Sequence, residues 1–117
     1  MRRLGDLERS VMEALWASPE PMTARDIQSS LPGPSALTTV LTVLDRLERK
    51  GFVGRDRAER AHRYHAVRSK EEYVSALMME ALSETNDRAT ALVRFVESVG
   101  DADARTLRDA LPRKSRR

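Results

Sequence analysis

Two short helical patterns separated by the breaker Pro32-Gly33-Pro34 constrain the fold of this chain more than any other feature. The first helix opens with Thr23-Ala-Arg-Asp26, a capping box in which two side chains satisfy backbone N–H groups at the helix start. Ser35 is positioned to cap the second helix, which is expected over about 36–50 with Gly51 as its C-cap. Two helices joined in this way form a helix-turn-helix.

A helix precedes this pair and a hairpin follows it. Apolar residues from Leu7 to Trp16 recur at helical spacing after a cap at Asp6, and Ser18-Pro19 ends that pattern. Residues 52–56 and 63–67 have the pattern of two short strands around a polar turn, which predicts a β-hairpin wing. The expected fold class is therefore mainly α with a small β-hairpin: a winged helix-turn-helix.

The second part of the chain predicts further helices. Ser69-Lys-Glu-Glu72 is another capping box, Asn86-Asp87 breaks the helix that it opens, and later helices reach Gly100 and Leu111. The expected organisation is a winged-helix domain over 1–67, a helical dimerisation region over 68–111 and a disordered basic tail over 112–117.

The short amphipathic helices after Val67 are too few to bury their apolar stripes in a separate monomeric core. A second copy of the chain would supply the missing face, so we expect a homodimer. The residues predicted to form its interface are Tyr73, Leu77, Met78, Leu82, Leu92, Phe95, Val96 and Leu107.

The helix over 36–50 has an unusual polar face. At about 100° per residue, its leucines and valines, Leu41 among them, fall on one arc, and three threonines fall on the opposite arc. Threonine is a poor helix former, so another reason for its presence is needed. Its short side chain lets a helix approach base edges, where the hydroxyl forms hydrogen bonds and the methyl contacts thymine. We therefore predict that Thr38, Thr39 and Thr42 read bases.

Basic side chains concentrate between Arg46 and Arg63, although the whole chain carries a formal charge of only +3. We expect them to neutralise DNA phosphates. The predicted phosphate contacts are Arg46, Arg49 and Lys50 on the helix, and Arg57, Arg60 and Arg63 in the wing. The alternatives are a solvated amphipathic helix and a charged loop that keeps a sheet edge soluble.

Several other classes of function have little support. The chain has no cysteine, which removes disulfides, thiolate metal sites and cysteine nucleophiles, and His62 and His65 are interpreted as ordinary wing residues. Neither a Gly-rich phosphate loop nor an HExxH motif occurs, so we expect no enzyme activity, metal or cofactor. No apolar run is long enough for a signal peptide or a membrane span, so a cytoplasmic location without membrane insertion is expected.

Taken together, these motifs resemble the penicillinase and methicillin-resistance repressor family, BlaI/MecI, from about Leu4 to Leu111. The resemblance is carried by Leu7–Trp16, Thr38–Gly51, Arg60–Tyr64 and Ala91–Glu97. It implies a transcriptional repressor whose N-terminal winged helix reads a palindromic operator in double-stranded DNA. It also implies a C-terminal helical region through which two chains intertwine.

The resemblance also assigns roles to single residues. Thr39 and Thr42 match base-reading positions, Thr38 stands beside them where some relatives have lysine, and Arg46 matches a position that contacts phosphate or braces the helix. Some members are inactivated by cleavage before a phenylalanine, triggered by a membrane sensor protease. The Arg94-Phe95 bond lies at that position, which makes a sensor-linked protease one expected partner; alternatively, Phe95 belongs only to the dimer core. The copper-responsive branch uses a C-terminal cysteine cluster, which this chain lacks.

Two other functions remain open from the sequence. The winged helix can serve as the scaffold of a protein-interaction adaptor, because a fold does not determine a function. The chain can also be a ligand-sensing regulator with an effector pocket between its domains.

Overall fold

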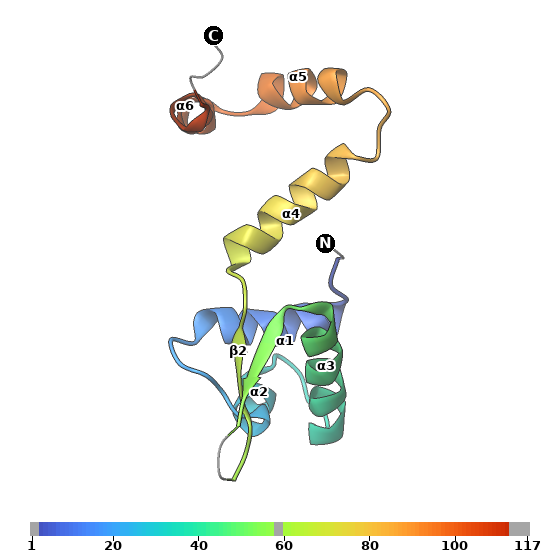
Figure 1. The fold of residues 1–117 in the computed structure, drawn as a ribbon, viewed down its shortest axis with the longest axis vertical. Helices are drawn as coiled ribbons and strands as arrows, with labels where there is room; N and C mark the ends of the chain where they lie inside the picture. The colour runs from blue at the N-terminus through green and yellow to red at the C-terminus, as the bar shows by residue number, and fades with distance from the viewer. Residues whose placement is uncertain (1–2, 58–59, 113–117) are drawn as a thin grey trace. The chain divides into compact units, whose positions relative to one another are not determined.

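A computed structural model describes residues 3–57 and 60–112 of the chain (Figure 1). These residues form helices and one antiparallel two-stranded sheet, in the order expected for a winged helix followed by further helices. The elements are α1 (Asp6–Ala17), α2 (Ala24–Ser30), α3 (Leu37–Lys50), β1 (Val53–Asp56), β2 (Arg63–Ala66), α4 (Lys70–Leu82), α5 (Arg88–Ser98) and α6 (Asp101–Ala110).

The chain divides into two compact units, one up to Leu77 and one from Met78. We call the first the winged unit. The division lies within α4, whereas the sequence suggested a boundary before that helix. The reason is Tyr73 in the first turns of α4, which is buried in the core of the winged unit together with Phe52 of the segment before β1.

The core of the winged unit is formed by the apolar faces of α1, α2 and α3. The amphipathic spacing expected for these helices is confirmed, because the residues that are buried all lie at that spacing. The buried side chains of the three helices are Val11, Met12, Leu15, Ile27, Val40, Val43, Leu44 and Leu47.

Most helix ends lie where the sequence predicts them. Gly51 ends α3 with a φ of 87°, a left-handed conformation that favours glycine. The Thr23–Asp26 capping box forms as predicted, with both N–H···O distances at 3.1 Å. The expected cap at Asp6 was wrong by one residue: Gly5 precedes α1, and its N–H donates to Glu8 Oε1 at 2.8 Å.

The predicted Ser35 cap was also wrong. Ala36 is the N-cap of α3 and provides no side-chain cap. The carbonyl of Ser35 instead accepts a hydrogen bond from Gln28 Nε2 at 2.8 Å, which fastens the turn between α2 and α3. The turn is therefore held by the hydrogen bond from Gln28 of α2, and no side-chain cap of α3 contributes.

The wing is an antiparallel pair in which Val53 lies opposite Ala66 and Asp56 lies opposite Arg63. A Cβ at Gly54 would lie 2.6 Å from the ring of His65, so a larger residue there would require this half-exposed ring to move. Backbone hydrogen bonds of 2.9 and 2.8 Å also pair Met22 with Tyr64. The segment before α2 is thus held against the wing.

In the second unit, α5 is capped by Asp87, whose carboxylate accepts from the Thr90 N–H at 3.1 Å. Neither α5 nor α6 contains a buried residue. Of the expected basic tail, residues 113–117 lie outside the described part of the chain. None of the helices described here is long and apolar enough to cross a membrane.

Candidate nucleic-acid interface

The threonine face of α3 is on the surface of the winged unit. Thr38, Thr39 and Thr42 are all exposed, while the opposite face of the helix is buried in the core. The Thr42 hydroxyl donates to the Thr38 carbonyl at 3.0 Å. With its hydrogen used inside the helix, Thr42 presents to the outside a methyl group and an oxygen that can only accept.

Two different surfaces flank this face. On one side, Thr39, Thr42 and Arg46 line a groove with Gly5 and Leu7 at the start of α1. On the other side, towards α2 and the wing, Leu41 is 41% exposed. Leu41 falls on the apolar arc of the helix, but the core covers a narrower arc than the one the leucines span, so Leu41 lies at its exposed edge.

The basic residues of α3 lie in different environments. Arg46 is exposed, and Arg49 Nη2 lies 2.7 Å from Asp45 Oδ2 in a pair that is open to solvent. Lys50 is only 22% exposed, and its Nζ lies 2.9 Å from Glu8 Oε2 and 3.1 Å from Glu8 Oε1. Lys50 therefore already has an anionic partner within the chain, which the sequence did not reveal.

Burial, Gly5 and Lys50 all affect the pKa of Glu8. Burial by itself raises the pKa of the Glu8 carboxyl. The N–H of Gly5, the ammonium of Lys50 and the charge of Arg46 together outweigh burial, so the pKa lies below its ordinary value of 4.5. Glu8 is thus ionised at neutral pH and joins the start of α1 to the end of α3.

Arg57, Arg60 and Arg63 of the wing are exposed, as a role in phosphate contacts requires. A further basic residue, Arg55, has a different position: its Nε lies 3.8 Å from Glu48 Oε2 and links β1 to α3. Tyr64 is buried in the core of the winged unit. Within the described ranges no group of three metal-ligating side chains occurs, and His65 Nδ1 lies 3.5 Å from Asp56.

An aromatic cluster holds the start of α4 on the winged unit. The Trp16 and Tyr73 rings lie 5.7 Å apart, Trp16 Nε1 donates to the Arg68 carbonyl at 2.9 Å, and the Leu4 N–H donates to the Tyr73 hydroxyl at 3.0 Å. The Arg9 guanidinium lies 5.7 Å from the centre of the Tyr73 ring. Tyr73, predicted as a dimer residue, is therefore engaged within its own chain.

Glu13 reinforces this attachment. Its two carboxylate oxygens accept from Arg9 Nε at 2.8 Å and from Lys70 Nζ at 3.1 Å. The hydrogen bond from Arg9 is the main cause that lowers the pKa of Glu13, and Lys70 adds to it. Because Lys70 is the first residue of α4, this carboxylate joins α1 to α4.

The other predicted dimer residues fall into two groups. Leu77 packs against the core of the winged unit, and Leu82 is half-buried. Large apolar side chains of the second unit are instead exposed: Met78, Leu92, Phe95, Val96 and Leu107. The Arg94-Phe95 bond lies within α5, and the Arg94 side chain is 80% exposed, 3.9 Å from Glu97.

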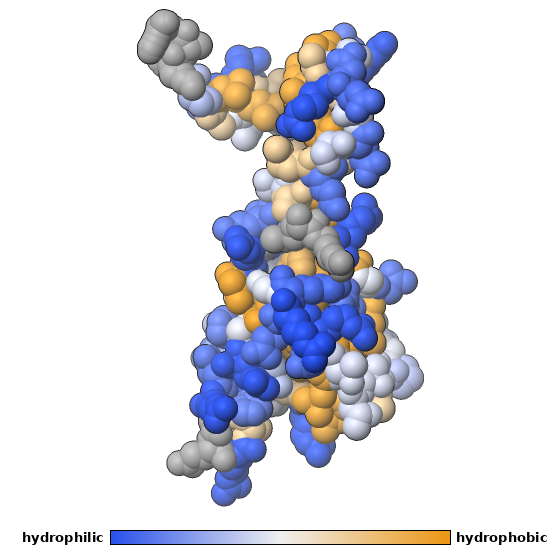
Figure 2. All heavy atoms as spheres, turned by 45° about the vertical axis from the view of Figure 1, so that its right-hand side comes forward, coloured by the Kyte–Doolittle hydropathy of each residue, from blue (hydrophilic) through white to orange (hydrophobic). Residues whose placement is uncertain are grey.

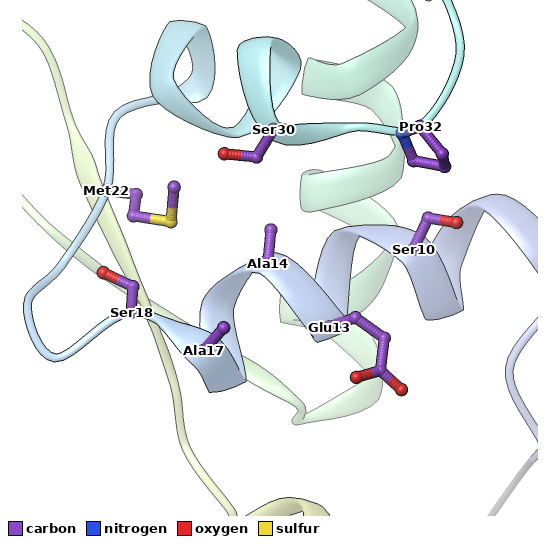
Figure 3. Close-up of a pocket in the computed structure, with 8 residues that line it drawn as sticks. All are labelled: Ser10, Glu13, Ala14, Ala17, Ser18, Met22, Ser30 and Pro32. Atoms are coloured by element: carbon purple, nitrogen blue, oxygen red, sulfur yellow. The ribbon is translucent and has the colours of Figure 1, made fainter.

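A groove between α1 and α2 is the one drawn in Figure 3. Among the eight lining residues labelled there, the one carboxylate is Glu13, which already binds Arg9 and Lys70. Small side chains such as Ala14 and Ala17 form much of the remaining wall, and no acid, base and nucleophile meet there among the labelled residues.

Comparison with known proteins gives consistent results. The profile of the family described as penicillinase repressor matches residues 4–113. Two proteins called transcriptional regulator BlaI, from two strains of Mycobacterium tuberculosis, are each 47% identical over 116 residues, covering 95% of this chain and 84% of the relative.

Solved structures share the fold. A MarR family protein from Bacillus stearothermophilus has a TM-score of 0.52 at 19% identity, over 92% of this chain and 70% of that chain. The complex structure of hsRosR-S4 has a TM-score of 0.55 at 20% identity, over 91% of this chain and 94% of that chain. The predicted winged-helix fold is confirmed by this likeness.

Proposed function

The chain belongs to the penicillinase repressor family and is a transcriptional repressor rather than an enzyme, and from this premise we propose how it selects its DNA. In this proposal α3 enters the major groove of an operator and the wing lies along the adjacent backbone. The exposed threonine face of α3 is the observation that carries the proposal. Thr39 and Thr42, with Thr38 beside them, read base edges.

Phosphate contacts would surround this reading face. Arg46 and Arg49 on α3, and Arg57, Arg60 and Arg63 on the wing, are exposed and can reach a DNA backbone. Lys50 contributes less than the others, because its ammonium is bound to Glu8 and is mostly buried. We therefore propose Lys50 as a brace for α3 that adds positive potential without a direct phosphate contact.

Two chains would bind together. The apolar side chains of α5 and α6 are exposed, and a second copy can cover them. A homodimer with two-fold symmetry presents two α3 helices, so the operator is a pseudo-palindrome whose half-sites face the same side of the duplex. In this arrangement Phe95 is a central apolar contact of the dimer.

The Arg94-Phe95 bond is a second element of the proposal. Because it lies within α5, a protease could cut it only after local unfolding of that helix. We propose that pairing of two chains protects the bond. Limited proteolysis followed by intact-mass measurement should show cleavage there rising as the protein is diluted; a rate independent of dilution would contradict this.

Selection of bound duplexes from a random pool tests the main proposal. An inverted repeat is the expected result, whereas an adaptor that does not bind DNA would show neither a recovered motif nor a steep salt dependence of binding.

Substitution of Thr39→Ala with Thr42→Ala then tests base reading. We expect the free-energy difference between specific and nonspecific binding to fall by about 1–3 kcal/mol per lost base contact. The affinity for nonspecific DNA should stay nearly unchanged. Thr106→Ala is a matched control, because Thr106 on α6 is also exposed and its hydroxyl also donates to the carbonyl four residues earlier. An unchanged ratio in the double variant would contradict base reading by these threonines.

A further inference from the structure

Leu41 differs from the other large aliphatic residues in the middle of α3. Val40, Leu44 and Leu47 are fully buried, yet Leu41 is 41% exposed in the same stretch of helix. Single exposed leucines are common on protein surfaces, so exposure alone carries no functional meaning. What matters is the surface on which this one lies.

Leu41 lies beside the threonine face. Thr38 is one turn before it, so the two side chains are neighbours on the helix surface. Leu41 also borders an open, mainly apolar groove between α2 and the wing, whose lining includes Ala24 and Leu37 together with the polar Thr23, Arg25 and His62. Figure 2 shows apolar side chains interrupting the polar surface at the lower end of the winged unit, where α3 begins. This apolar surface is continuous with the proposed DNA-reading face.

The chemistry of the major groove limits what Leu41 can contact. Base edges in that groove present hydrogen-bonding groups and one apolar group, the 5-methyl of thymine. A leucine side chain has no donor or acceptor, so that methyl is its natural partner. Thr42 lies on the other side of the threonine face, towards α1, so Leu41 is the apolar side chain at the edge next to α2 and the wing.

We propose that Leu41 is a specificity-determining residue that contacts the 5-methyl group of a thymine in each operator half-site. The inference rests on the proposed function, in which α3 occupies the major groove. It adds to that function a selection for thymine that uses no hydrogen bond. Leu41 then acts beside the threonines, whose hydroxyls read polar groups of the same half-site.

The test removes the methyl group alone. Each thymine in one half-site of the duplex recovered from the random pool is replaced in turn by deoxyuridine, which keeps every hydrogen-bonding group. Fluorescence anisotropy then gives the affinity of the wild-type chain and of Leu41→Ala for each duplex. We expect one position at which deoxyuridine weakens wild-type binding about fourfold, the equivalent of ~0.8 kcal/mol for one buried methyl. The Leu41→Ala chain should be insensitive to the same replacement.

Val67→Ala is the matched control, because Val67 is an exposed aliphatic residue of the winged unit outside α3. It should keep the wild-type response to deoxyuridine, and circular dichroism should show that both variants are folded. Equal sensitivity of wild type and Leu41→Ala at every position would overturn the inference, as would a half-site without thymine. A loss of self-association in Leu41→Ala would assign the residue to a protein contact instead. Absence of any sequence preference in the wild-type chain would contradict the proposed function itself.

Discussion

Helices α1 to α3 and helices α5 and α6 have apolar stripes of the same helical period, but only the first set is buried within the chain. Helix α3 buries Val40, Val43, Leu44 and Leu47, whereas neither α5 nor α6 buries any residue. The difference lies in the neighbours available: α1, α2 and the wing cover α3. An amphipathic stripe thus shows that a helix requires a partner, and only the packing shows whether that partner belongs to the same chain.

The same substitution in the two regions gives the largest expected contrast. Leu44→Ala leaves a cavity in the core and should lower the free energy of unfolding of the winged unit by about 2–5 kcal/mol. Leu92→Ala, on the exposed face of α5, should leave that free energy nearly unchanged in dilute solution. Urea unfolding followed by circular dichroism measures both. Similar losses would show that α5 already has a partner within its own chain.

The second prediction concerns association. Phe95→Ala removes an exposed aromatic side chain of α5 and should raise the dissociation constant of the homodimer about thirtyfold, for a loss of ~2 kcal/mol. Analytical ultracentrifugation over a concentration series gives this constant. Leu41→Ala is the control, because its exposed side chain belongs to the DNA face and should not affect association. If Phe95→Ala dimerises like the wild type, α5 is not the dimer surface.

The third prediction uses the buried ion pair of the winged unit. The pKa of Glu8 is lowered in the folded chain, so the stabilisation by Lys50 is fully present above the ordinary value of 4.5. It is lost as the pH falls through the lower, folded pKa. Glu8→Gln should cost about 1–2 kcal/mol at neutral pH and reduce the acid dependence of unfolding.

The Glu8 prediction can be checked by urea titrations from pH 7 downwards. Glu13 and Asp87 also have lowered pKa values, so part of the pH dependence should remain in the variant. An unchanged pH profile would show that the Glu8 pair contributes little to the stability of the fold.

The smallest effects are expected from exposed ion pairs. Asp45→Ala frees Arg49 on α3 and should change stability by less than about 1 kcal/mol, while nonspecific DNA affinity increases and its salt dependence becomes steeper. Glu97→Ala makes the same change of charge beside Arg94 on α5 and should leave DNA binding almost unaltered. Anisotropy titrations at two salt concentrations compare the two variants. Equal gains in DNA affinity for the two variants would mean that nonspecific binding depends only on the net charge of the chain.

The local elements follow from the sequence because their signals lie within a few residues of one another. Helical spacing, the Thr23 and Ser69 capping boxes and the Gly51 cap each depend on backbone groups that are close in the chain. These features determined where most helices begin and end and placed the threonine face on α3. Exposure of the threonines and of the wing arginines agrees with their predicted roles, and contact with DNA is still to be tested.

Contacts between distant residues were decided by the tertiary structure. The Glu8–Lys50 pair, the Met22–Tyr64 bridge and the burial of Tyr73 each join segments far apart in the chain, and the sequence contains no spacing that predicts them. The exposure of Leu41 is of the same kind, since it depends on how much of α3 its neighbours cover. The periodicity along a helix predicts which side of the helix is apolar. Whether that side is buried, and which charges are paired, depends on the residues that the fold places against it.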